Sequence, residues 1–423
     1  MASRIADIRT LEILDSRGNP TLDVQVTLEN GLVGSASVPA GASTGSAEAR
    51  ERRDGDAARY AGRGMIGARS SVEDRIRPKL VGHEPRRQAM LDHMMCRLDG
   101  TPDKRELGAN AILGTSLAIA RAAALDAGLP LYAYLGGVAA RRLPMPMLNV
   151  INGGAHADSG LDLQEFMVVP VGAPTFSEAL RFGVAVYAAL KALLGAAGQS
   201  TAVRDEGGFA PRLAGAAEAC DLLVEAIRRA GLEPGRDVAI ALDPAATGFR
   251  DGDGYALRDG GGRLSSGALL DLYGRLAAAY PIVSIEDGFA EDDWDGFRDQ
   301  TAAAGDRLQI VGDDLYATNP TLIARGIRER STNAALIKPN QIGTLTETMT
   351  AVALCREAGW RCVVSHRSGE TDDSFIADLA VGLGTGQIKA GAPCRGERIA
   401  KYNRLLAIER ELGDPDFRNP FAV

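Results

Sequence analysis

Lysine is scarce in this chain, since only six of its 47 basic residues are lysine. Arginine keeps its proton inside a protein, whereas a lysine whose pKa is lowered can act as a base. The positions that keep lysine are therefore the first to consider for proton transfer. They are Lys79, Lys104, Lys191, Lys338, Lys389 and Lys401.

The chain also has little cysteine, no net positive charge and no long apolar run. The five cysteines are odd in number and include no CxxC pair, which argues against a disulfide framework and a zinc site. A net charge of -8 with scattered basic residues argues against nucleic acid as a partner. No apolar run approaches the roughly 20 residues that span a bilayer, and the first residues form no signal region. We expect a cytoplasmic protein without membrane contact.

A length of 423 residues exceeds one ordinary domain. In the first third, the alternating stretch "TLDVQVTLENGLVGSASV" predicts a hairpin, and Ala109 to Leu129 predicts a long helix. The two prolines of Ala140 to Met147 indicate a domain boundary. We expect an N-terminal α+β capping domain over residues 1–139 and a catalytic α/β barrel domain over residues 140–423.

The second part contains short apolar runs separated by helical segments, the pattern of a parallel βα barrel. Each run ends on a charged or polar residue, and from Glu286 onward these residues follow one another at intervals of 23 to 28 positions. This interval fits one strand plus one helix. The runs are "VAIALD", "IVSIED", "LQIVGDD", "AALIKPN", "RCVVSHRSG" and "GQIKAG".

Three of these strand ends carry carboxylates, at Asp243, Glu286 and Asp313. The carboxyl ends of barrel strands open onto one face, so the three acids should converge there and repel one another unless a cation neutralises them. An all-oxygen ligand set favours Mg²⁺. The alternative is that each acid caps the helix that follows it. A single acid would favour the capping interpretation, but three in succession favour a metal site.

Lys338 and Lys389 end two further strands. A lone lysine at such a position usually extends its ammonium into water. If the two lie close together and near a divalent cation, we expect their pKa values to fall below the free value of about 10.4. One of them could then remove a proton from a substrate.

Two loops complete the expected pocket. The stretch "SHRSGETDD" offers a forked donor at Arg367 with a hydroxyl at Ser368, which suits an anion such as a phosphate. The glycine-rich stretch "PAGASTG", Pro39 to Gly45, could be a mobile lid over the rim or an ordinary surface loop.

Along essentially its whole length the chain resembles the enolase family. The resemblance rests on ordered motifs that include "DSRGNPT", "GASTG", "NVINGGAHAD", "LQEFM", "DEGGFAP", "SIEDGFAEDDWDGF", "GDDLYATN", "IKPNQIGTLTET", "SHRSGETDD" and "RIAKYNRLL". It implies an N-terminal α+β domain followed by a modified (β/α)8 TIM-type barrel that begins ββαα. It also implies a homodimer or higher oligomer, and the reversible dehydration of 2-phosphoglycerate to phosphoenolpyruvate with two Mg²⁺ ions.

The resemblance implies a role for each matching residue. Lys338 resembles the general base, and Glu206 resembles the acid that protonates the leaving hydroxyl, which requires it to hold a proton near neutral pH. Glu165 would assist Glu206. The implied first magnesium ligands are Asp243, Glu286 and Asp313, and Ser43 resembles the lid residue that reaches the second magnesium. The implied substrate-binding residues are His156, Gln164, Glu165, His366, Arg367, Ser368 and Lys389, with His156 also counted among the catalytic residues.

Some positions depart from the family pattern. Arg204 stands where glycine is usual, two residues before Glu206, and Ala40 stands where serine is usual. Arg204 could point to solvent or contact extra negative charge on a larger substrate. Two rival functions therefore stay open. One is an enolase-like enzyme, similar to carboxyphosphonoenolpyruvate synthase, that dehydrates a phosphonate analogue in natural-product biosynthesis; the other is a noncatalytic binding protein.

Overall fold

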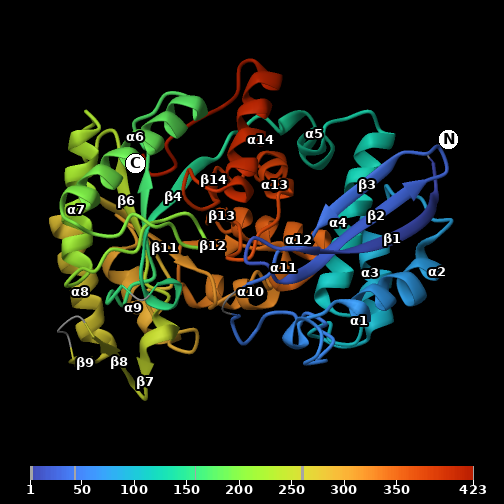
Figure 1. Ribbon diagram of the computed structural model, residues 1–423, viewed down its shortest axis with the longest axis horizontal. Coiled ribbons are helices and arrows are strands. Elements are labelled where there is room, and N and C mark those ends of the chain that lie inside the picture. Colours follow the sequence, from blue (N-terminus) through green and yellow to red (C-terminus); the bar gives the residue numbers. More distant parts are fainter. Residues whose placement is uncertain (1–2, 42–43, 158, 259–261, 423) are drawn as a thin grey trace.

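The computed structural model describes residues 3–41, 44–157, 159–258 and 262–422, and its N-terminal part lies beside a barrel (Figure 1). The N-terminal part contains an antiparallel sheet in the order β1-β2-β3. The predicted hairpin is confirmed, because β2 pairs with β3 from Asp23 opposite Ser37 to Thr27 opposite Val33. The strands are β1 (Ile5–Leu14), β2 (Pro20–Leu28) and β3 (Val33–Ser37).

One long helix, α4 (Ala109–Asp126), covers this sheet. The helix was predicted three residues longer, but Gly128 has a φ of +67° and Pro130 follows it, so the helical backbone ends earlier. Gly34 permits the close approach of β3, since a Cβ there would lie 2.4 Å from the carbonyl oxygen of Ala118. The other helical segments of this part are η1 (Tyr60–Gly62), α1 (Ile66–Ser70), η2 (Ser71–Ile76), α2 (Arg77–Leu80), α3 (Gln88–Asp99), α5 (Leu131–Gly136) and η3 (Gly137–Ala139).

Eight strands of the described chain close into a barrel in the order β10-β11-β12-β13-β14-β4-β5-β6. The first two form an antiparallel pair, and two helices follow them, so the barrel begins ββαα. The six runs expected to be strands are all strands. The barrel strands are β4 (Met145–Asn152), β5 (Glu165–Val169), β6 (Ala239–Asp243), β10 (Ile282–Glu286), β11 (Gln309–Gly312), β12 (Ala334–Ile337), β13 (Arg361–Ser365) and β14 (Gln387–Lys389).

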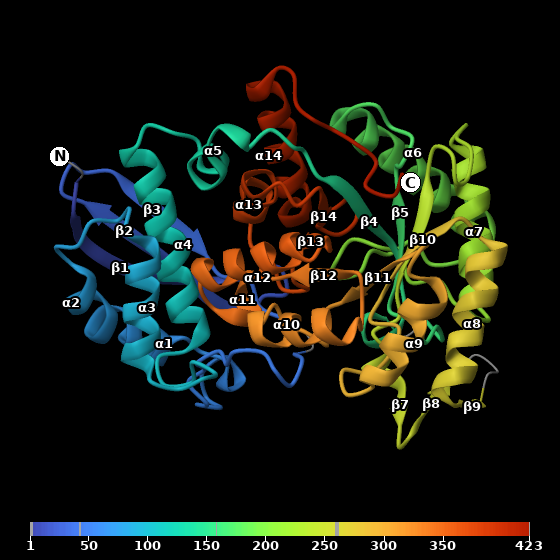
Figure 2. The ribbon, with the colours of Figure 1, turned by 180° about the vertical axis from the view of Figure 1, so that it is seen from behind.

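Helices surround the barrel, and two of them, α11 (Pro339–Ile342) and α12 (Leu345–Glu357), also contact the N-terminal helices α3 and α4 (Figure 2). A small sheet, β7 (Arg250–Asp251), β8 (Gly254–Leu257) and β9 (Gly262–Leu264), lies beside it. The remaining segments are η4 (Gly154–His156), α6 (Phe176–Ala196), α7 (Ala216–Arg229), η5 (Ala246–Phe249), α8 (Ser266–Ala279), α9 (Trp294–Ala304), α10 (Pro320–Glu329), α13 (Phe375–Leu383) and α14 (Gly396–Leu412).

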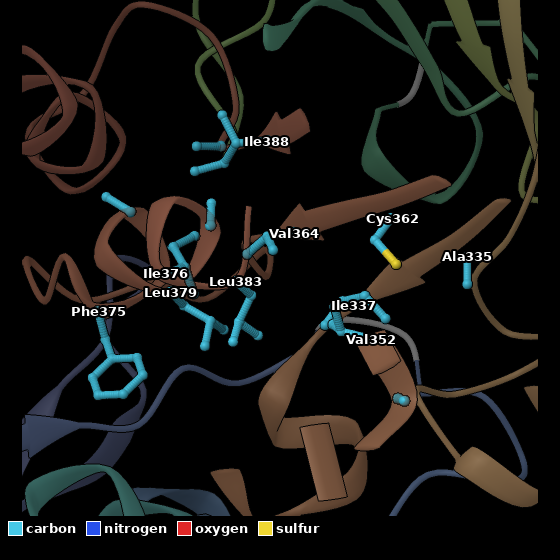
Figure 3. Packing of buried hydrophobic residues seen from close by; sticks show 14 of the residues in the cluster. Ala335, Ile337, Val352, Cys362, Val364, Phe375, Ile376, Leu379, Leu383 and Ile388 are labelled. Atoms are coloured by element: carbon cyan, nitrogen blue, oxygen red, sulfur yellow. The ribbon is translucent and has the colours of Figure 1, made fainter. Parts of the chain in front are cut away.

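The strands present alternate residues to two separate apolar clusters. The cluster inside the barrel includes Ala334 and Leu336 of β12 and Val363 of β13. The cluster between barrel and helices contains the alternate residues of the same strands. Figure 3 shows Ala335 and Ile337 in this outer layer with Ile376 and Leu379 of α13. Because side chains alternate along a strand, the residue after Ile337 faces the barrel axis.

One helix, α6, is long and apolar enough by length and composition to cross a membrane, although the sequence analysis expected no run approaching a span. Its charged residues Glu178, Arg181 and Lys191 interrupt the run in the sequence. In the structure, α6 packs against β4, α7 and α14 through one buried face that includes Val186 and Leu190. This packing is that of an outer helix of the barrel.

Candidate active site

The predicted site residues at the strand ends lie at the mouth of the barrel, because they continue the series of every second residue that faces its interior. Lys338 follows Ala334 and Leu336 in steps of two, and Asp243 follows Ala239 and Ala241. The same parity carries Glu165, Asp313 and Lys389 toward the axis. One cavity is lined by His156, Gln164, Glu165, Glu206, Asp243, Asp313, Lys338, His366, Arg367, Ser368 and Lys389. Among the described site residues, only Glu286 is outside this lining.

Two lysines, the buried Lys389 and the half-buried Lys338, contact the three predicted metal-ligating carboxylates. The Lys389 ammonium lies 2.8 Å from Asp243 Oδ2, 2.9 Å from Glu286 Oε1 and 3.1 Å from Glu165 Oε2. The Lys338 ammonium forms an ion pair with Asp313 Oδ2, and the Gln341 amide donates to Asp313 Oδ1 at 2.9 Å. Glu286 does not line the cavity itself, but it contacts Lys389, which does.

The carboxylates determine the charge of the two lysines. Burial alone would lower the pKa of Lys338, but Asp313 outweighs burial and raises it. Burial likewise opposes the charge of Lys389, yet Asp243 and Glu165 hold its pKa well above its usual range. Without a cation both lysine pKa values are raised, because each ammonium touches at least one carboxylate. The expectation of lowered values concerns a site that holds a divalent cation and stays a prediction.

A second group at the mouth consists of His156, Glu165 and Glu206, whose ligand atoms lie within 4.8 Å of one another. His156 Nδ1 lies 3.7 Å from Glu165 and 3.9 Å from Glu206. Glu206 accepts hydrogen bonds from the Asn149 amide at 3.0 Å and the Ser368 hydroxyl at 3.2 Å. Both carboxyl groups are buried, so the two share one dry environment.

Burial and the negative charge of Glu206 hold the pKa of Glu165 well above its usual range. Burial also acts on Glu206, but the neighbouring imidazoles of His156 and His366, together with the cations Arg398 and Lys389, outweigh it and hold the pKa of Glu206 well below its usual range. The structure thus places the proton of this carboxyl pair on Glu165. The expectation that Glu206 itself holds a proton near neutral pH is wrong here, because more positive groups surround Glu206.

Arg367 also lines the mouth, in a network that joins the two parts of the chain. Its guanidinium forms a two-point ion pair with Glu48, at 2.9 and 3.0 Å, and donates to the Asn340 side chain at 3.1 Å. Glu48 follows the glycine-rich loop by three residues. Neither Glu48 nor Asn149 was predicted from the sequence, although the position of Glu48 three residues after "GASTG" was a usable signal.

The glycine-rich loop reaches this rim in its described part. Ala40 and Gly369 exchange two backbone hydrogen bonds, at 2.8 and 2.9 Å, which attach the loop to "SHRSG". The backbone supplies these bonds, so alanine serves there as well as serine. Ser43, the predicted ligand of a second metal, lies outside the described residues.

The donor set at Asp243, Glu286 and Asp313 fits a divalent cation. All three carboxylates are buried, and Glu286 Oε2 has no hydrogen-bond partner in the described part of the chain. A second acidic group, Asp287, Asp313 and Asp314, has ligand atoms within 4.8 Å of one another. Both oxygens of Asp287 already accept the backbone N–H groups of Asp313 and Asp314, at 2.8 Å each. The predicted trio keeps Glu286 Oε2 for an ion that prefers oxygen ligands, and its other oxygens are held by lysine, amide and backbone donors.

Arg204 is exposed, and its hydrogen bonds run through its backbone to Gly208 and Arg395. We expect Arg204→Gly to leave kcat and KM for a small phosphorylated carboxylate within about twofold, since exposed substitutions away from buried contacts have small effects. Steady-state kinetics of the purified variant check this. A large loss would place the guanidinium in the core reaction.

Comparison with known proteins finds one family along the chain. The family model described as "Enolase, N-terminal domain" matches residues 5–135, and "Enolase, C-terminal TIM barrel domain" matches residues 140–419. Enolase 1 of Methylococcus capsulatus is 58% identical over 414 residues, which covers 98% of each chain. The enolase of Acidothermus cellulolyticus is 56% identical over 410 residues, 97% of this chain and 95% of the relative. Enolase 2 of Pseudomonas syringae pv. syringae is 55% identical over 418 residues, which covers 99% of this chain and 98% of the relative.

Proposed function

This chain belongs to the enolase family, and we propose that it catalyses the reversible dehydration of 2-phosphoglycerate to phosphoenolpyruvate with two Mg²⁺ ions per active site. It is a hydro-lyase of the phosphopyruvate hydratase type. The observation that carries the proposal is the meeting of a candidate base, a carboxyl pair and an anion site at one barrel mouth. We also propose the domain limits 1–139 and 140–423.

We assign the removal of the α-proton to Lys338. The proton next to a carboxylate is a weak acid, because its removal adds a second negative charge to that group. Lys338 directly follows β12, its half-buried ammonium forms an ion pair with Asp313, and its side chain lines the cavity. It has to lose its own proton before it can act, which requires that Asp313 no longer balance its charge.

We assign protonation of the leaving hydroxyl to the Glu165 and Glu206 pair. The two carboxyl groups interact strongly, so the proton belongs to the pair rather than to one residue. Glu206 remains the proposed donor to the substrate, and the raised pKa of Glu165 makes it the partner that can supply the shared proton. His156 lies between the two groups and can stabilise either charge distribution.

The remaining polar residues suit the two anionic ends of the substrate. Arg367, Ser368 and Lys389 offer charged and hydroxyl donors to a phosphate or carboxylate. Gln164, His156 and His366 line the same cavity and add further polar contacts. Glu48 orients the Arg367 fork and must release at least one of its hydrogen bonds if Arg367 is to bind a phosphate through both nitrogens.

Asp243, Glu286 and Asp313 are the proposed holders of the first magnesium, and Ser43 is the proposed contact to the second. When bound, Mg²⁺ would balance these carboxylates, stabilise the charge that develops on the substrate carboxylate and remove the interaction that keeps Lys338 protonated. Lys389 balances Asp243 and Glu286 in the structure, and a bound cation would take over this role and leave its ammonium available to the substrate.

The two rival functions are not favoured. The matches at 54 to 58% identity are enolases over nearly their full length, and the exposed Arg204 gives no specific support to a larger substrate. The buried base, acid pair and oxygen ligands would have no purpose in a noncatalytic binding protein, since buried charges destabilise a fold unless they are compensated.

The test of the proposed function is an absorbance assay with 2-phosphoglycerate. We expect phosphoenolpyruvate to form when Mg²⁺ is present, to stop forming after a chelator is added, and to form again when excess Mg²⁺ is restored. If no phosphoenolpyruvate forms even at high protein concentration with Mg²⁺ present, the proposal is contradicted. A parallel assay with a phosphonoformyl analogue would then distinguish the phosphonate-processing enzyme from the binding protein.

We propose a homodimer or a higher oligomer in the cytoplasm. Exposed apolar side chains gather near Glu12 of β1. Leu11 and Leu14 lie within two residues of it in the same strand. Glu12 also accepts hydrogen bonds from Arg59 and from the Met65 backbone, whose neighbours Tyr60 and Ile66 are exposed. An exposed apolar group of this kind is typical of a protein interface. Cytoplasmic location agrees with the relation to bacterial enolases.

A further inference from the structure

Arg398, in the first turn of α14, is the largest fully buried side chain of the described chain. Its Nη1 donates to His366 Nδ1 at 2.6 Å and to the Arg367 carbonyl at 2.5 Å. Its Nη2 donates to the carbonyls of Asp205 and Ser368, at 2.9 and 2.6 Å. The four terminal N–H bonds of a guanidinium thus have four acceptors, and three of these acceptors belong to "HRS".

The contact to His366 determines which ring nitrogen carries the proton. An arginine stays protonated inside a protein, so it can only donate, and His366 Nδ1 must accept. The ring proton therefore resides on Nε2, which lies 3.5 Å from Glu206 Oε2. Adding a second proton would require Nδ1 to give up the Arg398 bond.

The charged groups around His366 act in the same direction. Burial holds the pKa of His366 well below its usual range; Glu206 opposes burial, while Arg398, Lys389 and Lys338 reinforce it. The imidazole is consequently a neutral hydrogen-bond donor that faces the carboxyl pair.

The other three bonds of Arg398 join two loops that carry different parts of the proposed chemistry. Asp205 directly precedes the proposed acid Glu206, and Arg367 with Ser368 belongs to the proposed anion site. A planar fork holds carbonyl groups in fixed relative positions, whereas a lysine ammonium is a single point of donors on a flexible stem. The acid and the anion site are thus attached to one rigid group.

We propose that Arg398 is a positioning residue that fixes His366 as the neutral Nε2–H tautomer and sets the distance between the Glu206 loop and the anion site. The part of this inference that concerns catalysis rests on the proposed function. The part that concerns the imidazole does not, because it can be measured without substrate.

The first test is nitrogen NMR of wild-type protein labelled at histidine. The chain has four histidines, so the His366 signals can be assigned by comparison with a His366→Asn variant. We expect an unprotonated Nδ1 and a protonated Nε2 at every pH at which the fold persists. A protonated Nδ1, or an imidazolium near neutral pH, would overturn the proposal even if the enzyme is fully active.

The second test is Arg398→Lys, with Arg404→Lys as the matched control. Arg404 lies on the same helix and binds Asp378 at 2.8 and 2.9 Å, away from the site. In Arg398→Lys we expect mixed imidazole tautomers, a new ionisation in the pH profile of kcat, and a loss of kcat of up to about 100-fold, the cost of small misplacements. Arg404→Lys should lower Tm at most. Unchanged His366 signals in Arg398→Lys would contradict the inference, whatever happens to activity.

Discussion

Lys338→Ala is expected to abolish the exchange of the substrate's α-proton with solvent and to lower net dehydration by about 10²–10⁴-fold or more, the usual contribution of a general base. Exchange reports removal of the proton alone, independently of whether the hydroxyl later leaves. The variant also removes the partner of Asp313, so Asp313 should bind cations at least as well as before. The measurement is loss of deuterium from labelled 2-phosphoglycerate, followed by NMR.

The matched control is Lys191→Ala, which removes an exposed lysine of α6. It should change neither exchange nor dehydration. Persistent exchange in Lys338→Ala would contradict the assignment of the base and would direct attention to Lys389, the second buried amine of the mouth.

The positions of the site residues could be predicted from the sequence because a barrel strand alternates strictly between interior and exterior. Ala334, Leu336 and Lys338 share one parity, and so do Ala239, Ala241 and Asp243. Once the runs were assigned to parallel strands, the convergence of their last residues at one mouth was a consequence of geometry. The first barrel strand, β4, was harder to detect, since Pro144 and Pro146 indicated a linker.

Protonation could not be predicted, because it depends on which charges a fold brings into contact. The sequence led us to expect that Lys338 loses charge beside a divalent cation and that Glu206 keeps a proton. In the structure Asp313 keeps Lys338 charged, while the cations around Glu206 leave the proton on Glu165. Asn149 and Glu48 were missed for a similar reason, since each acts through a residue distant in the sequence.

The second large effect is expected from Glu206→Gln, which should lower dehydration by about 10²–10⁴-fold, the contribution of a general acid, and leave α-proton exchange in place. Glutamine keeps the shape of the side chain, and its amide oxygen can still accept from Asn149. The base, Lys338, directly follows β12, far along the chain from the turn that holds Glu206, and it is unaltered, so the first half of the reaction should continue. Kinetic assays and deuterium exchange on the same preparation measure the two halves separately.

The comparison of Glu206→Gln with Glu165→Gln and Asp205→Asn shows whether the carboxyl pair acts as a unit. Asp205 is the exposed neighbour of Glu206, and its replacement should affect neither half-reaction. If the pair shares one proton, Glu165→Gln should also lose dehydration while it keeps exchange, because a glutamine cannot return a proton to Glu206. Loss of exchange in Glu206→Gln to the same extent as dehydration would contradict a separate donor. The two halves of the reaction would then depend on one charge network that spans the barrel mouth.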